Sequence, residues 1–202
     1  MRKFKYIAII LSFICAFPTV TISQGSAIGS WRTHLPYSQL IDVVVVDDMV
    51  YAATPLSIFT YNKLDNRVDR FDKVRGLNDI GISKIGYNST TQEILVAYTN
   101  ANMDIITKEG AIINLPEIKD KEILGNKTIN NITFKENYAY LSCGFGIVIL
   151  DMDRKEIFDT YYIGPNGDAI NVYSTAYNDT SLFAATESGV YYADINGTNL
   201  GD

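Results

Sequence analysis

The sequence predicts an all-β repeat fold, and three observations lead to this prediction. Apolar and aromatic residues occur in short runs between turns rich in Asn, Asp and Gly, and no helical period is visible. A pattern of strand, small-residue turn and second strand recurs at residues 50–61, 93–107, 138–151 and 181–193. One small residue of each copy, namely Ala53, Ala97, Ser142 or Ala185, is separated from the next by 44, 45 and 43 residues. A sandwich or a barrel has no reason to keep such a constant period, whereas stacked repeats do.

Each repeat is expected to contain four antiparallel strands. The expected strands are 40–46, 49–53, 57–61 and 67–71; 82–87, 93–98, 103–107 and 112–118; 129–134, 138–142, 146–150 and 156–163; and 170–177, 181–185 and 189–193. Four antiparallel strands that repeat at this interval predict a β-propeller. The expected blades cover roughly residues 38–76, 80–120, 127–164 and 168–202.

The strands of one repeat differ in character. First strands such as 43–46 are almost continuously apolar, which predicts that they are covered on both faces. Fourth strands such as 67–71 contain charged residues, as expected of outer strands in contact with solvent.

The number of repeats predicts an incomplete ring. Three repeats are complete and the fourth lacks its outer strand, whereas propellers typically close with about four to eight blades. We therefore expect the front part of a longer protein, and the alternative is a closed ring of four blades. An open end is expected to expose a sheet face rich in Val, Tyr and Phe.

The N-terminus predicts export. Arg2, Lys3 and Lys5 precede an apolar run over residues 6–17, which is typical of a signal peptide and short for a membrane-spanning helix. We expect a signal peptide at 1–24 and a partial propeller over 25–202. Without residues 1–24 the chain has 14 basic and 23 acidic residues, a formal charge of −9. This charge argues against nucleic acid or an anionic membrane as a partner recognised through a general positive field.

The chain offers no persuasive catalytic, cofactor or metal site. Cys143 is the one cysteine beyond the signal peptide, so no disulfide within the chain is expected, and we predict a small buried residue. A catalytic thiol would need a histidine, and the sequence has only His34. A single histidine also excludes a site with several histidine ligands. We therefore expect a non-enzymatic protein with no catalytic, cofactor-binding or metal-binding residues.

Three further groups of residues have both a functional and a structural explanation. His34 beside Trp31 and Tyr37 could lie in a ligand pocket, although packing is the more frequent role of such a residue. The pair Asp151 and Asp153 could form half of a calcium site, but a solvated turn fits the sequence better. The 14 tyrosines could stack on sugars, or they could pack between blades, which we favour.

Several segments carry resemblances to known families. Residues 50–54 and 182–186 resemble the repeat of two-component regulator propellers. A longer ordered set, namely residues 31–37, 76–79, 102–104, 125–130, 140–149 and 159–164, resembles the N-terminal propeller of the PorZ family, which belongs to the type IX secretion system of Bacteroidetes.

The second resemblance implies a non-enzymatic protein at the cell surface, associated with the outer membrane. Its implied partners are a sortase-like protease, other proteins of the attachment complex, and the anionic lipopolysaccharide to which secreted cargo is linked. The alternative is a periplasmic ligand-sensing propeller of a two-component hybrid sensor kinase. A propeller enzyme would need converging carboxylates or other acid–base groups, and the sequence shows no persuasive set.

Overall fold

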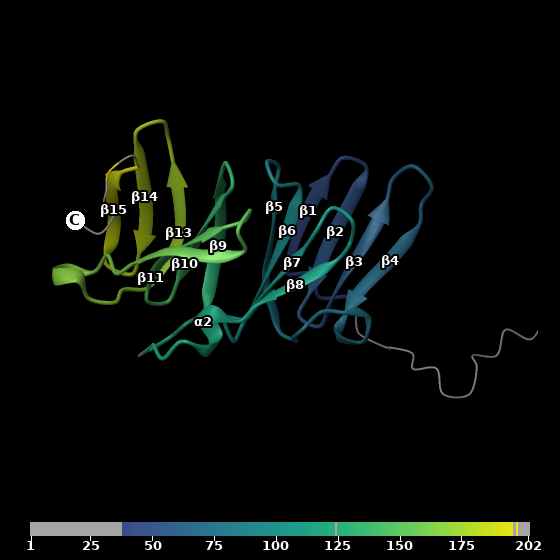
Figure 1. Ribbon diagram of the computed structural model, residues 1–202, viewed down its shortest axis with the longest axis horizontal. Helices are drawn as coiled ribbons and strands as arrows, with labels where there is room; N and C mark the ends of the chain where they lie inside the picture. The colour runs from purple at the N-terminus through teal and green to yellow at the C-terminus, as the bar shows by residue number, and fades with distance from the viewer. Residues whose placement is uncertain (1–37, 124, 196, 198–202) are drawn as a thin grey trace, which may run out of the picture. The chain divides into compact units, whose positions relative to one another are not determined.

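The computed structural model describes residues 38–123, 125–195 and 197, and these residues form four antiparallel sheets (Figure 1). The strands are β1 (Asp42–Val46), β2 (Met49–Thr54), β3 (Ser57–Asn62), β4 (Val68–Asp72), β5 (Ile82–Asn88), β6 (Glu93–Tyr98), β7 (Met103–Ile106), β8 (Ile112–Leu115), β9 (Ile129–Lys135), β10 (Tyr138–Cys143), β11 (Gly146–Asp151), β12 (Glu156–Tyr161), β13 (Val172–Tyr177), β14 (Ser181–Thr186) and β15 (Gly189–Asp194). The predicted signal peptide and the group around His34 lie outside the described residues.

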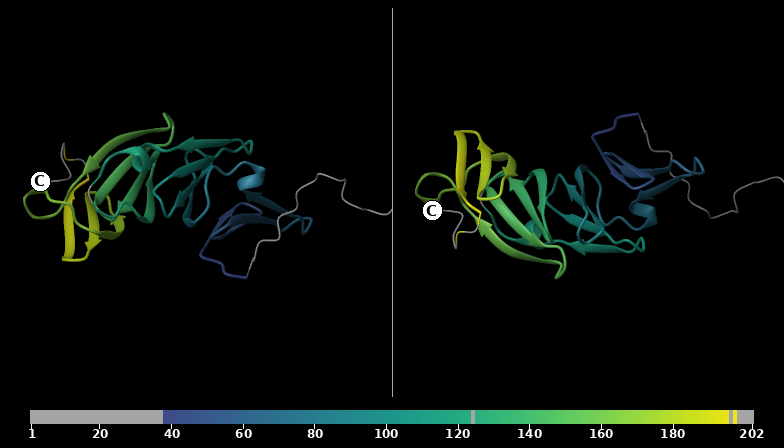
Figure 2. Two further views of the ribbon diagram at one scale, coloured as in Figure 1. Left: turned by 90° about the horizontal axis from the view of Figure 1, so that it is seen from below. Right: turned by 90° about the horizontal axis from the view of Figure 1, so that it is seen from above.

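Each sheet is a meander in which consecutive strands are hydrogen-bonded neighbours. The four sheets, called blades 1 to 4, have the orders β1-β2-β3-β4, β5-β6-β7-β8, β9-β10-β11-β12 and β13-β14-β15. The predicted all-β class is confirmed, and the predicted strands agree with the observed ones to within two residues at each end, apart from the end of β8. The views in Figures 1 and 2 show the blades following one another in chain order, from purple to yellow.

Neighbouring blades meet through their first strands. The strand β5 contacts β1 on one side and β9 on the other, and β9 also contacts β13. Polar groups join these strands directly: the N–H of Ile85 donates to Asp42 Oδ2 at 3.2 Å, and the Thr133 hydroxyl donates to the carbonyl of Thr175 at 2.8 Å. First strands that lie together on the inner side of successive sheets are the arrangement of propeller blades.

The apolar cores lie between the blades. Alternate residues of β6 point to different cores: Ile94 and Val96 pack with residues of blade 1, whereas Leu95 and Ala97 pack with residues of blade 3. The strand β11 divides in the same way between blades 2 and 4. A strand exposes successive side chains on opposite faces, so one apolar strand can supply two cores. The stability of each blade therefore depends on its neighbours.

The outward faces of blades 1 and 4 are exposed. In β1, Val43 and Val45 are 56% and 58% exposed, while Val44 and Val46 pack towards blade 2. The prediction that this first strand is covered on both faces is therefore wrong, because no described element packs on its outer side. In blade 4, Val190 and Tyr192 are 72% and 76% exposed, and the Tyr192 ring lies 6.2 Å from that of Phe183. The predicted exposed face rich in Val, Tyr and Phe is confirmed, and the described residues do not form a closed ring of four blades.

A short helix replaces the end of one predicted strand. The strand β8 ends at Leu115, and α2 (Glu117–Asp120) follows Pro116, so the expected strand over 112–118 and the expected absence of helix are both wrong. Proline has no N–H to donate and ends the strand pairing. Ile118 then becomes buried from the helix. Two 3-10 turns, η1 (Lys73–Arg75) and η2 (Pro165–Gly167), are the remaining elements of the described residues. Across the described residues, no helix has the length and apolar character needed to cross a membrane.

Candidate functional site

A buried carboxylate lies at the centre of blade 2. Asp104, on β7, is 0% exposed, and each of its carboxylate oxygens accepts two hydrogen bonds. The Tyr98 hydroxyl and the Asn78 N–H donate to Oδ2 at 2.5 and 2.8 Å. The side-chain amides of Asn78 and Asn114 donate to Oδ1 at 3.0 and 2.8 Å. Four donors around one carboxylate compensate for the removal of that group from water.

A second carboxylate, Asp79, extends this arrangement to α2. It accepts hydrogen bonds from the side-chain amide of Asn100 at 2.6 Å and from the Lys119 ammonium, on α2, at 3.0 Å. Burial alone would raise the pKa of Asp79, but the bonds from Asn100 and Lys119, together with the N–H of Ile80, hold that pKa well below its usual range. We call Asp79, Asp104 and their donors the carboxylate network.

The carboxylate network has a structural role. Burial raises the pKa of Tyr98 far above its ordinary value, and the hydrogen bond to Asp104 and the charge of Asp104 raise it further. Tyr98 is therefore a neutral hydrogen-bond donor at physiological pH. No residue of the network contributes to the pocket beside α2 or to the pocket between blades 1 and 2. The network instead joins a loop, two strands and α2 into one unit.

The carboxylate network explains two of the segments that carry the family resemblance. Segments 76–79 and 102–104 are far apart in the sequence, yet Asn78 of one bonds Asp104 of the other. Gly76 ends the turn η1 with φ of +116°, a conformation that favours glycine, and Leu77 is then buried. The sequence showed both segments but contained no signal that they lie together.

Replacing Asp79 with Asn is expected to reduce the free energy of unfolding by about 1–2 kcal/mol at neutral pH, because charge-assisted hydrogen bonds are lost. The native pKa of Asp79 is lower than that of the unfolded chain, which is about 4. The carboxylate therefore stabilises the fold above about pH 4, and this contribution disappears as the pH falls through the native pKa.

Urea unfolding of the wild-type and Asp79→Asn proteins between about pH 7 and pH 3 measures this effect. The difference in stability should become smaller towards low pH. Asp153→Asn, at an exposed turn position, is the matched control and should show little difference at any pH. A difference for Asp79→Asn that stays constant or grows as the pH falls would contradict the assignment.

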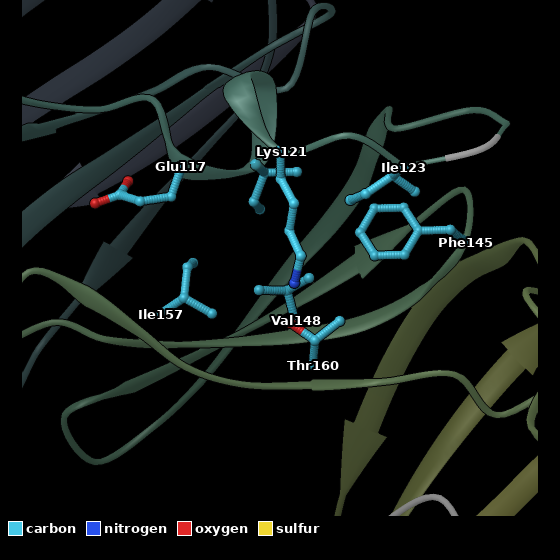
Figure 3. A pocket seen from close by; sticks show the side chains of 8 residues that line it. Glu117, Lys121, Ile123, Phe145, Val148, Ile157 and Thr160 are labelled. Carbon is cyan, nitrogen blue, oxygen red and sulfur yellow. The ribbon is translucent and has the colours of Figure 1, made fainter.

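A pocket of about 200 Å³ lies between α2 and the outer strands of blade 3 (Figure 3). We call it the α2 pocket. The residues that line it come from α2 and the segment after it, from the β10–β11 turn, and from β11 and β12: Glu117, Ile118, Lys121, Ile123, Phe145, Val148, Ile157 and Thr160. The sequence did not predict this pocket.

The floor of the α2 pocket is apolar and its rim is polar. Ile118, Phe145 and Val148 are almost completely buried as residues, whereas Glu117 and Lys121 are exposed. In Figure 3 the Lys121 side chain extends across the pocket towards Thr160, and the Glu117 carboxylate points away from both. The pocket therefore combines an apolar interior with a cation and a hydroxyl at its mouth, which are the features of a small-ligand site.

Two sets of contacts hold the walls of the α2 pocket. Lys119 anchors α2 to Asp79, and the Lys127 ammonium donates to the carbonyls of Lys119 and Lys121 at 2.8 and 2.5 Å. On the side of blade 3, Gly144 and Gly146 flank Phe145. A Cβ at Gly144 would lie 2.5 Å from the carbonyl oxygen of Asn126, so glycine is required there.

A second pocket of about 190 Å³ lies between blades 1 and 2, where Tyr51 and Tyr87 both line it. Burial raises the pKa of Tyr51, and the neighbouring Tyr87 adds to this rise. Both tyrosines also pack against the core between these blades. This pair therefore has the packing role that we favoured for the tyrosines.

The other candidate residues from the sequence have structural roles. Cys143 is fully buried, as predicted, and burial raises the pKa of its thiol to about 12, so a reactive thiolate is not available at neutral pH. Asp151 accepts the N–H groups of Asp153 and Arg154 at 2.9 and 3.1 Å and is itself buried, which makes it a turn residue. Throughout the described part of the chain, no three His, Cys, Asp or Glu residues are grouped so that they could hold a metal ion.

Comparisons with known proteins agree with this fold. The PorZ structure from Porphyromonas gingivalis, described as an essential bacterial surface component of the type IX secretion system, has a TM-score of 0.72 and 27% identity, over 81% of this chain and 21% of that one. The extracellular domain of BT4673, a hybrid two-component system protein of B. thetaiotaomicron, has a TM-score of 0.64 and 16% identity, over 79% of this chain and 23% of that one. The Pan2 WD40 domain of Neurospora crassa has a TM-score of 0.57 and 16% identity, over 81% of this chain and 51% of that one.

The last two likenesses show the fold alone, and the chain spans about a fifth of the PorZ structure. A comparison with curated proteins found no match. The family model for the type IX secretion protein PorZ, N-terminal β-propeller domain, matches residues 50–202, which confirms the resemblance predicted from the sequence. This chain therefore belongs to the family of PorZ N-terminal β-propeller domains.

Proposed function

We propose that this chain is part of an exported, non-enzymatic surface component of the type IX secretion system. In this role it supports the processing of secreted cargo and the attachment of that cargo to lipopolysaccharide. The observation that carries the proposal is the family match over residues 50–202. The buried, unreactive thiol of Cys143 and the structural role of the carboxylate network are consistent with an interaction module.

The proposed partners are a sortase-like protease, other proteins of the attachment complex, and anionic lipopolysaccharide. The chain has a formal net charge of −6, so its overall field repels an anionic glycolipid. Any direct contact with such a glycolipid would therefore depend on local hydrogen-bond donors and individual cations. The contact with protein partners has no such restriction.

Deletion of the gene tests this proposal. We expect the deletion strain to secrete its cargo without cleaving the C-terminal signals and without anchoring the cargo to the cell surface. Immunoblots of cell and medium fractions measure both steps, and the wild-type gene supplied in trans should restore them. Normal processing and anchoring in the deletion strain would refute the proposal.

Two variants test whether the propeller itself is needed. Complementation with Gly146→Ala, which disturbs blade 3, should fail, whereas complementation with Gly110→Ala should succeed because a Cβ at Gly110 has no heavy atom within 4 Å. Equal complementation by both variants, with urea unfolding showing that Gly146→Ala is strongly destabilised, would mean that an intact propeller is dispensable for anchoring.

The second candidate is a ligand-sensing propeller of a two-component system. The likeness to the extracellular domain of BT4673 favours it, although at 16% identity that likeness concerns the fold. The coding sequence downstream of this segment distinguishes the two candidates. A transmembrane helix followed by a kinase domain would support the sensor, and a β-sandwich secretion signal would support the first proposal.

A further inference from the structure

We propose that the α2 pocket binds a small monocarboxylate with an apolar chain of about the size of a leucine side chain. The inference rests on the contacts, charges and volume of the α2 pocket. It does not depend on a role in type IX secretion, since the sensor alternative would leave the pocket unchanged.

The apolar part of the ligand is indicated by the floor of the pocket. Ile118, Phe145 and Val148 are the most buried of the lining residues and form this floor, and Ile157 also lines the pocket. Their side chains carry no hydrogen-bonding group, so a polar ligand group at this depth would lose its contacts with water without replacement. A branched hydrocarbon chain instead gains free energy from burial here.

The carboxylate is indicated by the mouth of the pocket. Among the described residues, the Lys121 ammonium has no hydrogen bond or ion pair, and neither does the Thr160 hydroxyl. Lys121 extends across the opening towards Thr160 (Figure 3). Two donors that face each other above an apolar floor match a carboxylate, and a charge-assisted hydrogen bond is stronger than a neutral one.

A single negative charge is indicated by the other end of the rim. Glu117 lies one helical turn before Lys121, but its carboxylate points away from the ammonium and no ion pair joins them. A second anionic group on the ligand would approach Glu117 and be repelled. The pocket therefore favours a monocarboxylate over a dicarboxylate.

The volume limits the ligand to a small molecule. At about 200 Å³ the pocket is smaller than the roughly 300–1,000 Å³ of sites that hold drug-sized ligands. A branched acid such as 4-methylpentanoate, with about eight non-hydrogen atoms, is of this size.

Titration of the protein with 4-methylpentanoate, followed by NMR or calorimetry, tests the proposal. The neutral isostere 4-methylpentanamide and the cation 4-methylpentylamine serve as matched probes. We expect the acid to bind about tenfold more tightly than the amide, because the bond from Lys121 is charge-assisted. No binding of the acid, equal binding of the amide, or preferred binding of the amine at Glu117 would each overturn the proposal.

Variants then identify the residues that bind the carboxylate. Lys121→Met keeps the apolar stem and should weaken binding of the acid about tenfold, while Lys121→Arg keeps the charge and should retain most of it. Thr160→Val should weaken binding about threefold. Lys73→Met, which removes an exposed lysine outside the pocket, is the control for net charge and should leave the affinity unchanged. Unchanged affinity in Lys121→Met would overturn the assignment, and so would equal losses in Lys121→Met and Lys73→Met.

The same titration with a peptide that ends in leucine tests whether the carboxylate belongs to a peptide chain instead of a free acid. A peptide ending in leucine presents the same group with a chain in front of it. If such a peptide binds more than about tenfold better than the free acid, the site recognises a chain terminus, and the proposal of a free small acid is overturned.

Discussion

Replacing Asp104 with Asn is expected to reduce the free energy of unfolding by about 2–4 kcal/mol. A fully buried carboxylate, which only accepts hydrogen bonds, is exchanged for an amide, in which one oxygen is replaced by a donor NH2 group. Both oxygens of Asp104 accept two hydrogen bonds, so the new amide nitrogen would face two donors whichever way it is oriented. At least two of the donors at this buried carboxylate would then lose their acceptor. The urea midpoint of the purified variant measures the loss.

Two controls make the Asp104 result specific. Asp153→Asn makes the same chemical change at an exposed position and should alter stability by less than about 0.5 kcal/mol. Tyr98→Phe removes one donor to Asp104, so its effect and that of Asp104→Asn should not be additive in the double variant. An Asp104→Asn protein as stable as the wild type would show that the carboxylate network contributes nothing to the fold.

Replacing Gly146 with Ala is expected to be at least as damaging, at about 3 kcal/mol or more, because two unfavourable effects coincide. The added Cβ would lie 2.2 Å from the carbonyl oxygen of Tyr161, and the φ of +153° is one that residues with a Cβ rarely adopt. The β10–β11 turn would have to move away from β12, and Phe145 in the floor of the α2 pocket would move with it.

Gly110→Ala separates these two effects. Gly110 also has a positive φ, +83°, but no heavy atom lies within 4 Å of a Cβ built there. This variant should therefore show only the backbone penalty, about 1 kcal/mol. If Gly146→Ala loses no more stability than Gly110→Ala, the close approach to Tyr161 is not important for the fold.

The strands could be predicted well because their signals are local. A strand needs an alternating or apolar run and a turn at each end, and both can be read from consecutive residues. The turn at Asp47 and Asp48, for example, lies between β1 and β2 as expected. The largest error was at the end of β8, where the apolar residue Ile118 continued the pattern although Pro116 had already ended the strand.

The partners of buried polar groups could not be predicted in this way. Asn78 and Asp104 are 26 residues apart, and Lys119 is 40 residues from Asp79. Many Asn, Asp and Lys residues of this chain could form such pairs, and the sequence alone does not rank them. The family resemblance marked segments 76–79 and 102–104 without showing that they form one hydrogen-bonded unit.

By itself, the sequence determined the all-β class, the repeat of four-stranded blades and the family, because each depends on patterns that recur along the chain. Only the tertiary structure decided that Phe145, Ile118 and Ile157 share one pocket. The same holds for the four hydrogen bonds that Asp104 accepts and for the outward direction of Val43. These facts depend on which strands of different blades meet and at what distance. That outcome follows from packing between distant segments, which local periodicity does not encode.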